Sequence, residues 1–318
     1  MKDKTTISDE TKKRLEEGFD LVVSYSGGKD STATCLYLFD MGYSKSDFKR
    51  VFMDTGWESD RTYEYIDQVQ KDVGEIITIK NQVDISGYPK IAQDMIKDLE
   101  EMIGFESPFI RLVFSNHCFP NHFQKWCTRE LKIRVFKGFC DAQDGDMINI
   151  VGVRRSESKR RANVEEWEWN SNFDCWTWRP LYLWQDADVI DIHKRFGLVP
   201  NGLYLNGHNR VGCYPCIYFG KRDLKHISQK RINVIERFER YLGDFLIAQS
   251  KNKKVLAHLE NAKSTHGYIY RSFFKSKNLK HEPITKVIEW AKTSRGGKQL
   301  ELFDTNVPTC HKWGLCGI

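Results

Sequence analysis

A short apolar run that ends at two adjacent glycines most constrains how this chain can fold. Residues 21–25 (LVVSY) have the length and composition of a buried parallel strand, and residues 31–41 continue with apolar side chains at helical spacing. Glycines let a backbone approach a phosphate group closely, and the first turn of a helix offers unpaired N–H groups. We therefore predict a phosphate-binding loop over residues 24–31. A glycine turn that serves only helix packing is the alternative.

Hydroxyl groups and one ammonium group accompany the glycines of this loop. The spacing is not that of the Walker motif, which requires G-x-x-x-x-G-K-[ST]. The residues that we expect to bind the nucleotide here are Ser24, Ser26, Gly27, Gly28, Lys29, Asp30 and Ser31.

The first half of the chain alternates between strand and helix patterns. Apolar runs near residues 21–25, 50–53, 75–79 and 147–153 alternate with helical patterns at 31–41, 61–73 and 129–140. This order predicts an α/β fold with a doubly wound parallel sheet, in which ligands bind beyond the carboxyl ends of the strands. After residue 218, long polar helical patterns replace the apolar strands. We therefore expect a nucleotide-binding domain over residues 1–218 and a basic, mainly helical extension over residues 219–318.

The charge of the chain is unevenly distributed. The net charge is +6, and residues 220–298 hold 19 Lys and Arg against 7 Asp and Glu. A segregated basic region favours a polyanionic partner such as nucleic acid, and a solvated helical surface is the alternative. Within it, residues 268–280 interleave aromatic and basic side chains, as a nucleic-acid platform or an amphipathic core helix would.

The composition is that of an ordinary globular protein. Hydrophobic residues make up 40% and charged residues 29% of the chain. No stretch approaches the roughly 18 apolar residues of a membrane helix, and the polar N-terminus lacks the pattern of a signal peptide. We expect a cytoplasmic protein without membrane association. Nine cysteines in a reducing compartment are more often buried, catalytic or metal-bound than disulfide-bonded.

The loop and several later motifs resemble a known superfamily. Residues 26–31 (SGGKDS) are similar to the pyrophosphate-binding loop of the N-type ATP pyrophosphatases, the adenine nucleotide alpha hydrolase superfamily. The later motifs resemble its phosphoadenosine phosphosulfate reductase branch. They occur in the family's order over roughly residues 20–218, in the segments 51–56 (VFMDTG), 126–132 (WCTRELK), 152–161 (GVRRSESKRR), 179–189 (RPLYLWQDADV) and 210–216 (RVGCYPC).

The resemblance implies further site residues. It places Asp54 and Thr55 beside the adenosine, and it adds Lys132, Gly152, Arg154 and Ser158 to the nucleotide-binding set. The candidate catalytic residues are Lys29, Asp30, Arg154 and Arg161.

The chemistry of the side chains supports a phosphate-binding role for the arginines and suggests a metal ion beside the phosphates. A cluster of arginines at 154–161 follows a predicted strand end, and guanidinium groups bind phosphate bidentately, although a basic surface turn is the alternative. Asp30 and Asp54 are candidates to position Mg²⁺ with ATP, and each is equally suited to cap a helix or to bond the loop.

The cysteines suggest a second, metal-binding site. Cys213-x-x-Cys216 is compatible with zinc, an iron–sulfur cluster or a redox pair. Cys310 and Cys316 near the C-terminus could complete a four-thiolate site, and Cys127 is a fifth candidate. The resemblance favours [4Fe–4S] over Zn²⁺, although Thr128 stands where iron–sulfur adenylyl-sulfate reductases have a second adjacent cysteine.

The other cysteines carry less signal. Cys35, Cys140 and Cys175 lie in apolar or aromatic surroundings and are expected to be ordinary buried residues. The role of Cys118, beside His117, stays undecided at this point.

Three functions remain in view. The first is cleavage of ATP between the α and β phosphates, which adenylates an acceptor for sulfur transfer from a donor such as a cysteine desulfurase. A nucleic acid is one candidate for the acceptor. The second is reduction of adenylyl sulfate or phosphoadenylyl sulfate. The reductases usually degrade the glycine loop and end in Glu-Cys-Gly-Leu-His, whereas this chain keeps the loop and ends at residues 314–318 in GLCGI. The third is a nucleotide- or nucleic-acid-binding module without turnover.

Overall fold

A mainly parallel, six-stranded sheet forms the centre of the computed structural model, which describes residues 7–249, 251, 253–274, 282–293 and 313. The strand order is β3-β2-β1-β4-β6-β5, and only the β5–β6 pair is antiparallel. The strands are β1 Asp20–Tyr25, β2 Lys49–Asp54, β3 Ile77–Lys80, β4 Met147–Ile150, β5 Trp167–Asn170 and β6 Cys175–Trp178.

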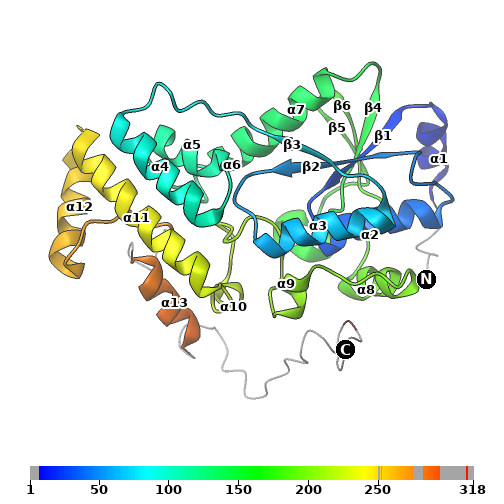
Figure 1. Ribbon diagram of the computed structural model, residues 1–318. Helices are drawn as coiled ribbons and strands as arrows, with labels where there is room; N and C mark the ends of the chain where they lie inside the picture. Colours follow the sequence, from blue (N-terminus) through cyan, green and yellow to red (C-terminus); the bar gives the residue numbers. More distant parts are fainter. Residues whose placement is uncertain (1–6, 250, 252, 275–281, 294–312, 314–318) are drawn as a thin grey trace.

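Helices flank this sheet and make up the region that follows it (Figure 1). They are α1 Asp9–Glu16, α2 Lys29–Asp40, α3 Asp60–Val73, α4 Lys90–Ile103, α5 Pro108–Asn116, α6 Trp126–Thr128, the π-helical turn η1 Arg129–Ile133, α7 Arg134–Asp141, the 3₁₀ turns η2 Arg155–Glu157 and η3 Lys159–Arg161, α8 Asp186–Arg195, α9 Gly202–Leu205, α10 Lys221–Leu224, α11 Gln229–Gln249, α12 Lys253–His266 and α13 Ile284–Lys292.

The expected fold class is confirmed. The sheet is doubly wound, with an antiparallel β5–β6 hairpin at one edge that the apolar runs did not predict, and a helical C-terminal region follows. The boundary between residues 218 and 219 stays a prediction. One hydrophobic cluster contains buried residues from both sides of it, such as Leu99 of α4 and Phe238 of α11.

Alternate side chains of the central strands enter two different cores. Val23 and Tyr25 of β1 pack in the cluster that includes α2, α3 and α8. Val22 lies on the opposite face, in the cluster that includes Phe136 of α7. This alternation is the period-2 pattern of a strand covered on both faces, which explains the continuous apolar run of β1.

Much of the C-terminal region contributes to the core. The aromatic side chains of Tyr270, Phe273 and Phe274 are buried, with exposed fractions of 2%, 1% and 7%. They therefore pack as core residues and do not form the stacking platform considered for residues 268–280, of which residues 275–280 lie outside the described part. Within the described residues, no helix is long and apolar enough to cross a membrane.

The topology places a crevice at the middle of the sheet. The chain runs from β1 outward through β2 to β3 on one side, and then returns to β4 on the other side of β1. Connections that leave two adjacent parallel strands in opposite directions open a crevice beyond the carboxyl ends of those strands. The loop after β1 and the segment after β4 therefore meet there.

Candidate functional site

The loop between β1 and α2 has the backbone shape that its glycines permit. Gly27 has a φ of 69°, and a Cβ at this position would lie 3.1 Å from Cγ2 of Thr62. Ser31 holds the loop from inside, because its hydroxyl accepts the N–H of Ser26 at 3.2 Å and donates to the carbonyl of Gly28 at 3.0 Å. The turn is thus closed by its own side chains and leads directly into the first turn of α2.

Several N–H groups of this loop are available to a ligand. Among the described residues, the amides of Gly27, Gly28, Asp30 and Ser31 have no hydrogen-bond acceptor, whereas the amide of Lys29 donates to the hydroxyl of Tyr204 at 3.1 Å. Adjacent amides at the start of a helix attract anions through both their hydrogens and the helix dipole. The loop can therefore hold a phosphate group.

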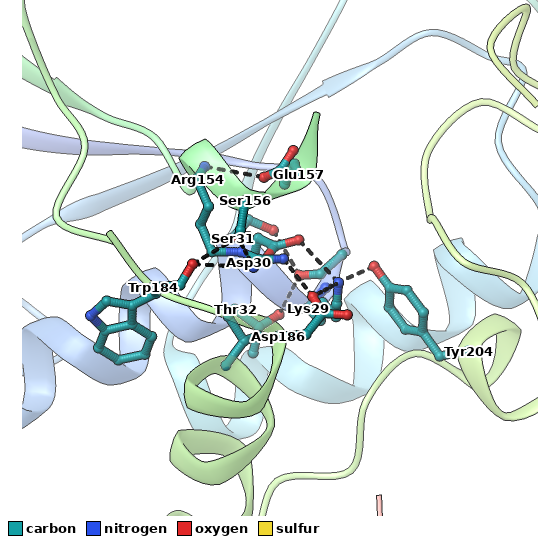
Figure 2. A network of polar contacts seen from close by, with 12 residues as sticks. Lys29, Asp30, Ser31, Thr32, Arg154, Ser156, Glu157, Trp184, Asp186 and Tyr204 are labelled. Carbon is teal, nitrogen blue, oxygen red and sulfur yellow. Dashed lines mark hydrogen bonds and ion pairs between the residues drawn. The ribbon is translucent and has the colours of Figure 1, made fainter. Parts of the chain in front are cut away.

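A network of ion pairs surrounds the start of α2 (Figure 2). Nε of Arg154 lies 2.6 Å from Oδ1 of Asp30, and Nη2 of Arg154 lies 2.7 Å from Oδ1 of Asp186. Nζ of Lys29 lies 3.1 Å from the same Asp186 oxygen. Burial raises the pKa of Asp186, but the charges of Lys29 and Arg154 outweigh this effect and lower the pKa below its usual value.

Arg154 is buried and held by several polar contacts. Its side chain is 2% exposed, and it also donates to the hydroxyl of Ser156 at 2.9 Å. Two residues earlier, Gly152 packs on the start of α2, where a Cβ would lie 2.5 Å from the carbonyl oxygen of Asp30. The segment after β4 can approach the loop this closely only because Gly152 has no side chain.

A second group of guanidinium groups lies beside this network. Burial lowers the pKa of Arg161, and the nearby charges of Arg210, Arg154 and Arg179 lower it further, while Asp30 acts in the opposite sense. Arg161 also pairs with Glu157. A bound anion reduces the repulsion between several neighbouring cations, and a phosphate group would be such an anion.

The turn after β2 also carries polar side chains. Oδ1 of Asp54 accepts hydrogen bonds from the amide of Gly56 and the hydroxyl of Tyr63, each at 2.7 Å. The Thr55 hydroxyl donates to Glu58 at 2.8 Å, and burial together with the charge of Asp54 raises the pKa of Glu58. The expected Asp54 and Thr55 therefore shape this turn through internal contacts.

Three of the candidate metal-binding cysteines lie near one ammonium group. The charge of Lys132 interacts with Cys213, Cys216 and Cys127, and with Glu58. Burial would lower the pKa of Lys132, but these neighbours outweigh it and raise the pKa. Burial and the charge of Glu58 in turn raise the pKa of Cys213.

The thiols suit soft metals, but the described residues do not form a complete site. No group of three or more His, Cys, Asp or Glu within the described ranges could hold a metal ion. The other two expected ligands, Cys310 and Cys316, lie outside the described residues. Cys35 and Cys175 are buried as expected, and Cys140 is only half-buried.

The remaining expected residues take less central places. Ser24 donates to Oδ1 of Asn149 at 2.8 Å and so ties β1 to β4. Ser158 is exposed between η2 and η3. The sequence reasoning did not single out Tyr204 or Asp186, which both contact Lys29. Asp186 lies inside the matched segment 179–189, which was a usable signal, whereas no local pattern marks Tyr204.

The chain is similar in sequence to several known proteins. Residues 20–218 match the family model of the phosphoadenosine phosphosulfate reductase domain. A 37.8 kDa uncharacterized protein of Escherichia phage 186 is 28% identical over 89% of this chain and 91% of its own length. The adenosine 5'-phosphosulfate reductase of Staphylococcus haemolyticus is 28% identical over 63% of this chain and 71% of its own length. A phosphoadenylyl-sulfate reductase structure from Candida auris aligns with a TM-score of 0.44 at 14% identity, covering 66% of this chain and 98% of that one.

Proposed function

The chain belongs to the phosphoadenosine phosphosulfate reductase family, and from that premise we propose that it is an enzyme that cleaves ATP between the α and β phosphates. An oxygen of the acceptor attacks the α phosphorus, the bond to the bridging oxygen breaks, and pyrophosphate leaves. The acceptor loses a proton to water and carries AMP. The terminal sulfur of a persulfide on a donor protein, such as a cysteine desulfurase, then bonds to the acceptor carbon while AMP leaves with the acceptor oxygen. A thiol reduces the resulting disulfide and releases the donor protein.

The intact loop between β1 and α2 is the observation that carries this proposal. Its amides at Gly27, Gly28, Asp30 and Ser31, which have no acceptor in the described part of the chain, are suited to the two phosphates of a departing pyrophosphate. A substrate such as adenylyl sulfate has no pyrophosphate group, so a reductase of that substrate would not need such a loop.

The side chains of the site take distinct roles in this proposal. Lys29 and Arg161 neutralise the charge that develops on the phosphates, because Lys29 belongs to the loop and Arg161 is near Asp30. Arg154 and Asp30 position the loop, since each is already engaged by the other. Lys132 and Ser158 stay expected nucleotide contacts.

Mg²⁺ would accompany the nucleotide in this reaction. Its hard oxygen ligands would come mainly from phosphates and water, because Asp30 already pairs with Arg154 and Asp54 already accepts two hydrogen bonds. We therefore assign these two aspartates to the support of the loops.

A cysteine-bound metal belongs to the same proposal. We propose Cys213 and Cys216 as ligands, with Cys127, which also interacts with Lys132, and Cys310 and Cys316 as the other candidates. The donor chemistry suits a [4Fe–4S] cluster or Zn²⁺, but the described cysteines do not complete a site. No step of the reaction is therefore routed through it.

Reduction of adenylyl or phosphoadenylyl sulfate is the second candidate, and the match to the reductase domain over residues 20–218 favours it. One experiment distinguishes the candidate functions. The full chain is incubated with [α-³²P]ATP in one sample, and with adenylyl sulfate or phosphoadenylyl sulfate in others. Release of pyrophosphate with label on an acceptor supports ATP cleavage. Release of sulfite supports the reductase, and ATP binding without any product would indicate a module that only binds.

A further inference from the structure

One aromatic side chain of the segment before α6 is almost fully exposed. Phe123 is 97% exposed and lies between α5 and α6. Its loop is ordered by Asn121, whose Oδ1 accepts the N–H groups of Phe123 at 2.9 Å and of Gln124 at 3.0 Å. Because Phe123 is not buried, its side chain adds no hydrophobic stabilisation to the fold. A binding role would explain its exposed position.

A second aromatic ring beside this loop is surrounded by nitrogen groups. The ring of Tyr218 lies 4.8 Å from the ring of His122, with the planes at 80°. Nζ of Lys125 and the guanidinium of Arg210 lie 5.9 Å and 5.8 Å from the centre of the Tyr218 ring. Within the described part of the chain, neither Lys125 nor Arg210 forms an ion pair with a carboxylate.

Arg210 connects these side chains to the arginines of the phosphate site. Arg210 is close enough to Arg161 to lower its pKa, and Arg161 in turn interacts with Asp30 of the phosphate loop. At the other end, Lys125 precedes Cys127 by two residues, and Tyr218 follows Cys216 by two residues. We name the five residues His122, Phe123, Lys125, Arg210 and Tyr218 the aromatic–basic strip.

We propose that the aromatic–basic strip binds a single-stranded segment of nucleic acid. Aromatic faces stack on bases of any sequence, and unpaired cations between them attract the phosphates of the same strand. The strip carries no carboxylate that would repel a phosphate. Arg210 of the strip lies near Arg161 of the phosphate site, so this inference rests on the proposed function and names its acceptor.

The basic C-terminal region is a poorer candidate for the same partner. Some of its described cations form ion pairs within the chain, since Lys230 pairs with Asp60, Arg237 with Asp98 and Arg240 with Glu236. Its aromatic rings at 270, 273 and 274 are buried. These three rings are therefore not available to stack on the bases of a bound strand.

Fluorescence anisotropy tests the proposal. The full chain is titrated into a fluorescein-labelled 20-nucleotide RNA, into DNA of the same sequence, and into the matching duplexes. We expect single strands to bind more tightly than duplexes, and Phe123→Ala and Tyr218→Ala each to weaken binding about 5-fold or more. Tyr218→Phe should retain binding, because the ring remains. Arg210→Ala should reduce the slope of log affinity against log salt by about 0.7. The matched controls are Phe196→Ala, which removes a partly exposed ring elsewhere, and Lys263→Ala on α12.

Calorimetric ATP binding on the same samples separates the two proposals. If ATP binds but single strands do not, or bind equally well to all the variants, the strip proposal is wrong and the proposed function stands. Duplexes that bind as tightly as single strands would also overturn the strip proposal. The same holds if no strand binds and light scattering shows a wild-type dimer that the Tyr218→Ala substitution dissociates. If strands bind as expected but ATP neither binds nor reacts, the proposed function fails and the strip remains.

Discussion

Nε of Arg154 lies 2.6 Å from the carboxylate of Asp30, and this contact joins two loops that are 124 residues apart in the sequence. Asp30 lies in the first turn of α2, and Arg154 follows β4. Because β1 and β4 are adjacent parallel strands, their carboxyl ends bring these loops together. The shape of the phosphate loop therefore depends on a residue from the other side of the crevice.

Replacement of Arg154 by lysine tests this dependence. A lysine keeps the charge but has no planar fork, so it cannot contact Asp30 and Asp186 at once as Arg154 does. We expect Arg154→Lys to reduce the affinity for ATP about 10-fold and to lower the free energy of unfolding by about 1–3 kcal/mol. Calorimetry and urea denaturation measure both quantities. Arg160→Lys, at an exposed position, should change neither, and unchanged ATP affinity in Arg154→Lys would show that Arg154 does not position the loop.

Gly152 offers a steric test of the same contact. A methyl group at this position would lie 2.5 Å from the carbonyl oxygen of Asp30, which belongs to the backbone and cannot rotate away. We expect Gly152→Ala to displace the loop, to abolish detectable ATP binding and to lower the melting temperature. Gly138→Ala is the matched control, because a methyl group there meets no atom within 4 Å and replaces a glycine within α7. That control should be neutral or stabilising by about 0.5–1 kcal/mol. Normal ATP binding by Gly152→Ala would contradict the close packing.

Features encoded in short segments of the sequence were predictable, and features made by long-range contacts were not. The loop of residues 24–31 was predictable because strand, glycines and helix start follow one another directly. The antiparallel β5 was not, since its exposed edge position gives it no apolar run. Tyr204 was missed for a related reason, as it reaches the amide of Lys29 from a helix of four residues 175 positions away.

Arg161 provides a test of the anion site. Its guanidinium lies among Arg210, Arg154 and Arg179, an arrangement that a bound phosphate would stabilise. Because hydrogen bonds to charged groups contribute about 1.5–3 kcal/mol, Arg161→Ala should weaken ATP binding roughly 10- to 100-fold. The neighbouring Arg160→Ala is the control, since Arg160 is exposed. Equal affinities of the two variants would remove Arg161 from the nucleotide site.

The cysteines give a prediction that does not depend on activity. If Cys213 binds a metal, Cys213→Ser should lower the iron or zinc content of anaerobically purified protein, and a brown cluster should lose its visible absorption. Cys175→Ser is the control, because Cys175 is buried in β6 away from the other candidates. Metal analysis together with the anaerobic spectrum measures the outcome. The same metal content and spectrum in wild type and Cys213→Ser would rule out Cys213 as a ligand.

Glu239 predicts an unusual pH dependence of stability. Its side chain is 1% exposed and accepts the N–H groups of Phe273 at 2.6 Å and Ile284 at 2.8 Å. Burial raises the pKa of Glu239 to about 8, although these two hydrogen bonds act in the opposite sense. In the unfolded chain a glutamate has a pKa of about 4.3.

Between these two pKa values the folded state holds a proton that the unfolded state has lost. The stabilisation is therefore complete below about pH 4.3 and is lost as the pH rises through about 8. On raising the pH from 5 to 8, we expect the free energy of unfolding of the wild type to fall by a few kcal/mol relative to Glu239→Gln, which cannot ionise. Urea denaturation at both pH values measures the difference, and Glu260→Gln on the exposed side of α12 should follow the wild type. Parallel pH profiles of the wild type and Glu239→Gln would mean that Glu239 is ionised in the folded protein throughout this range.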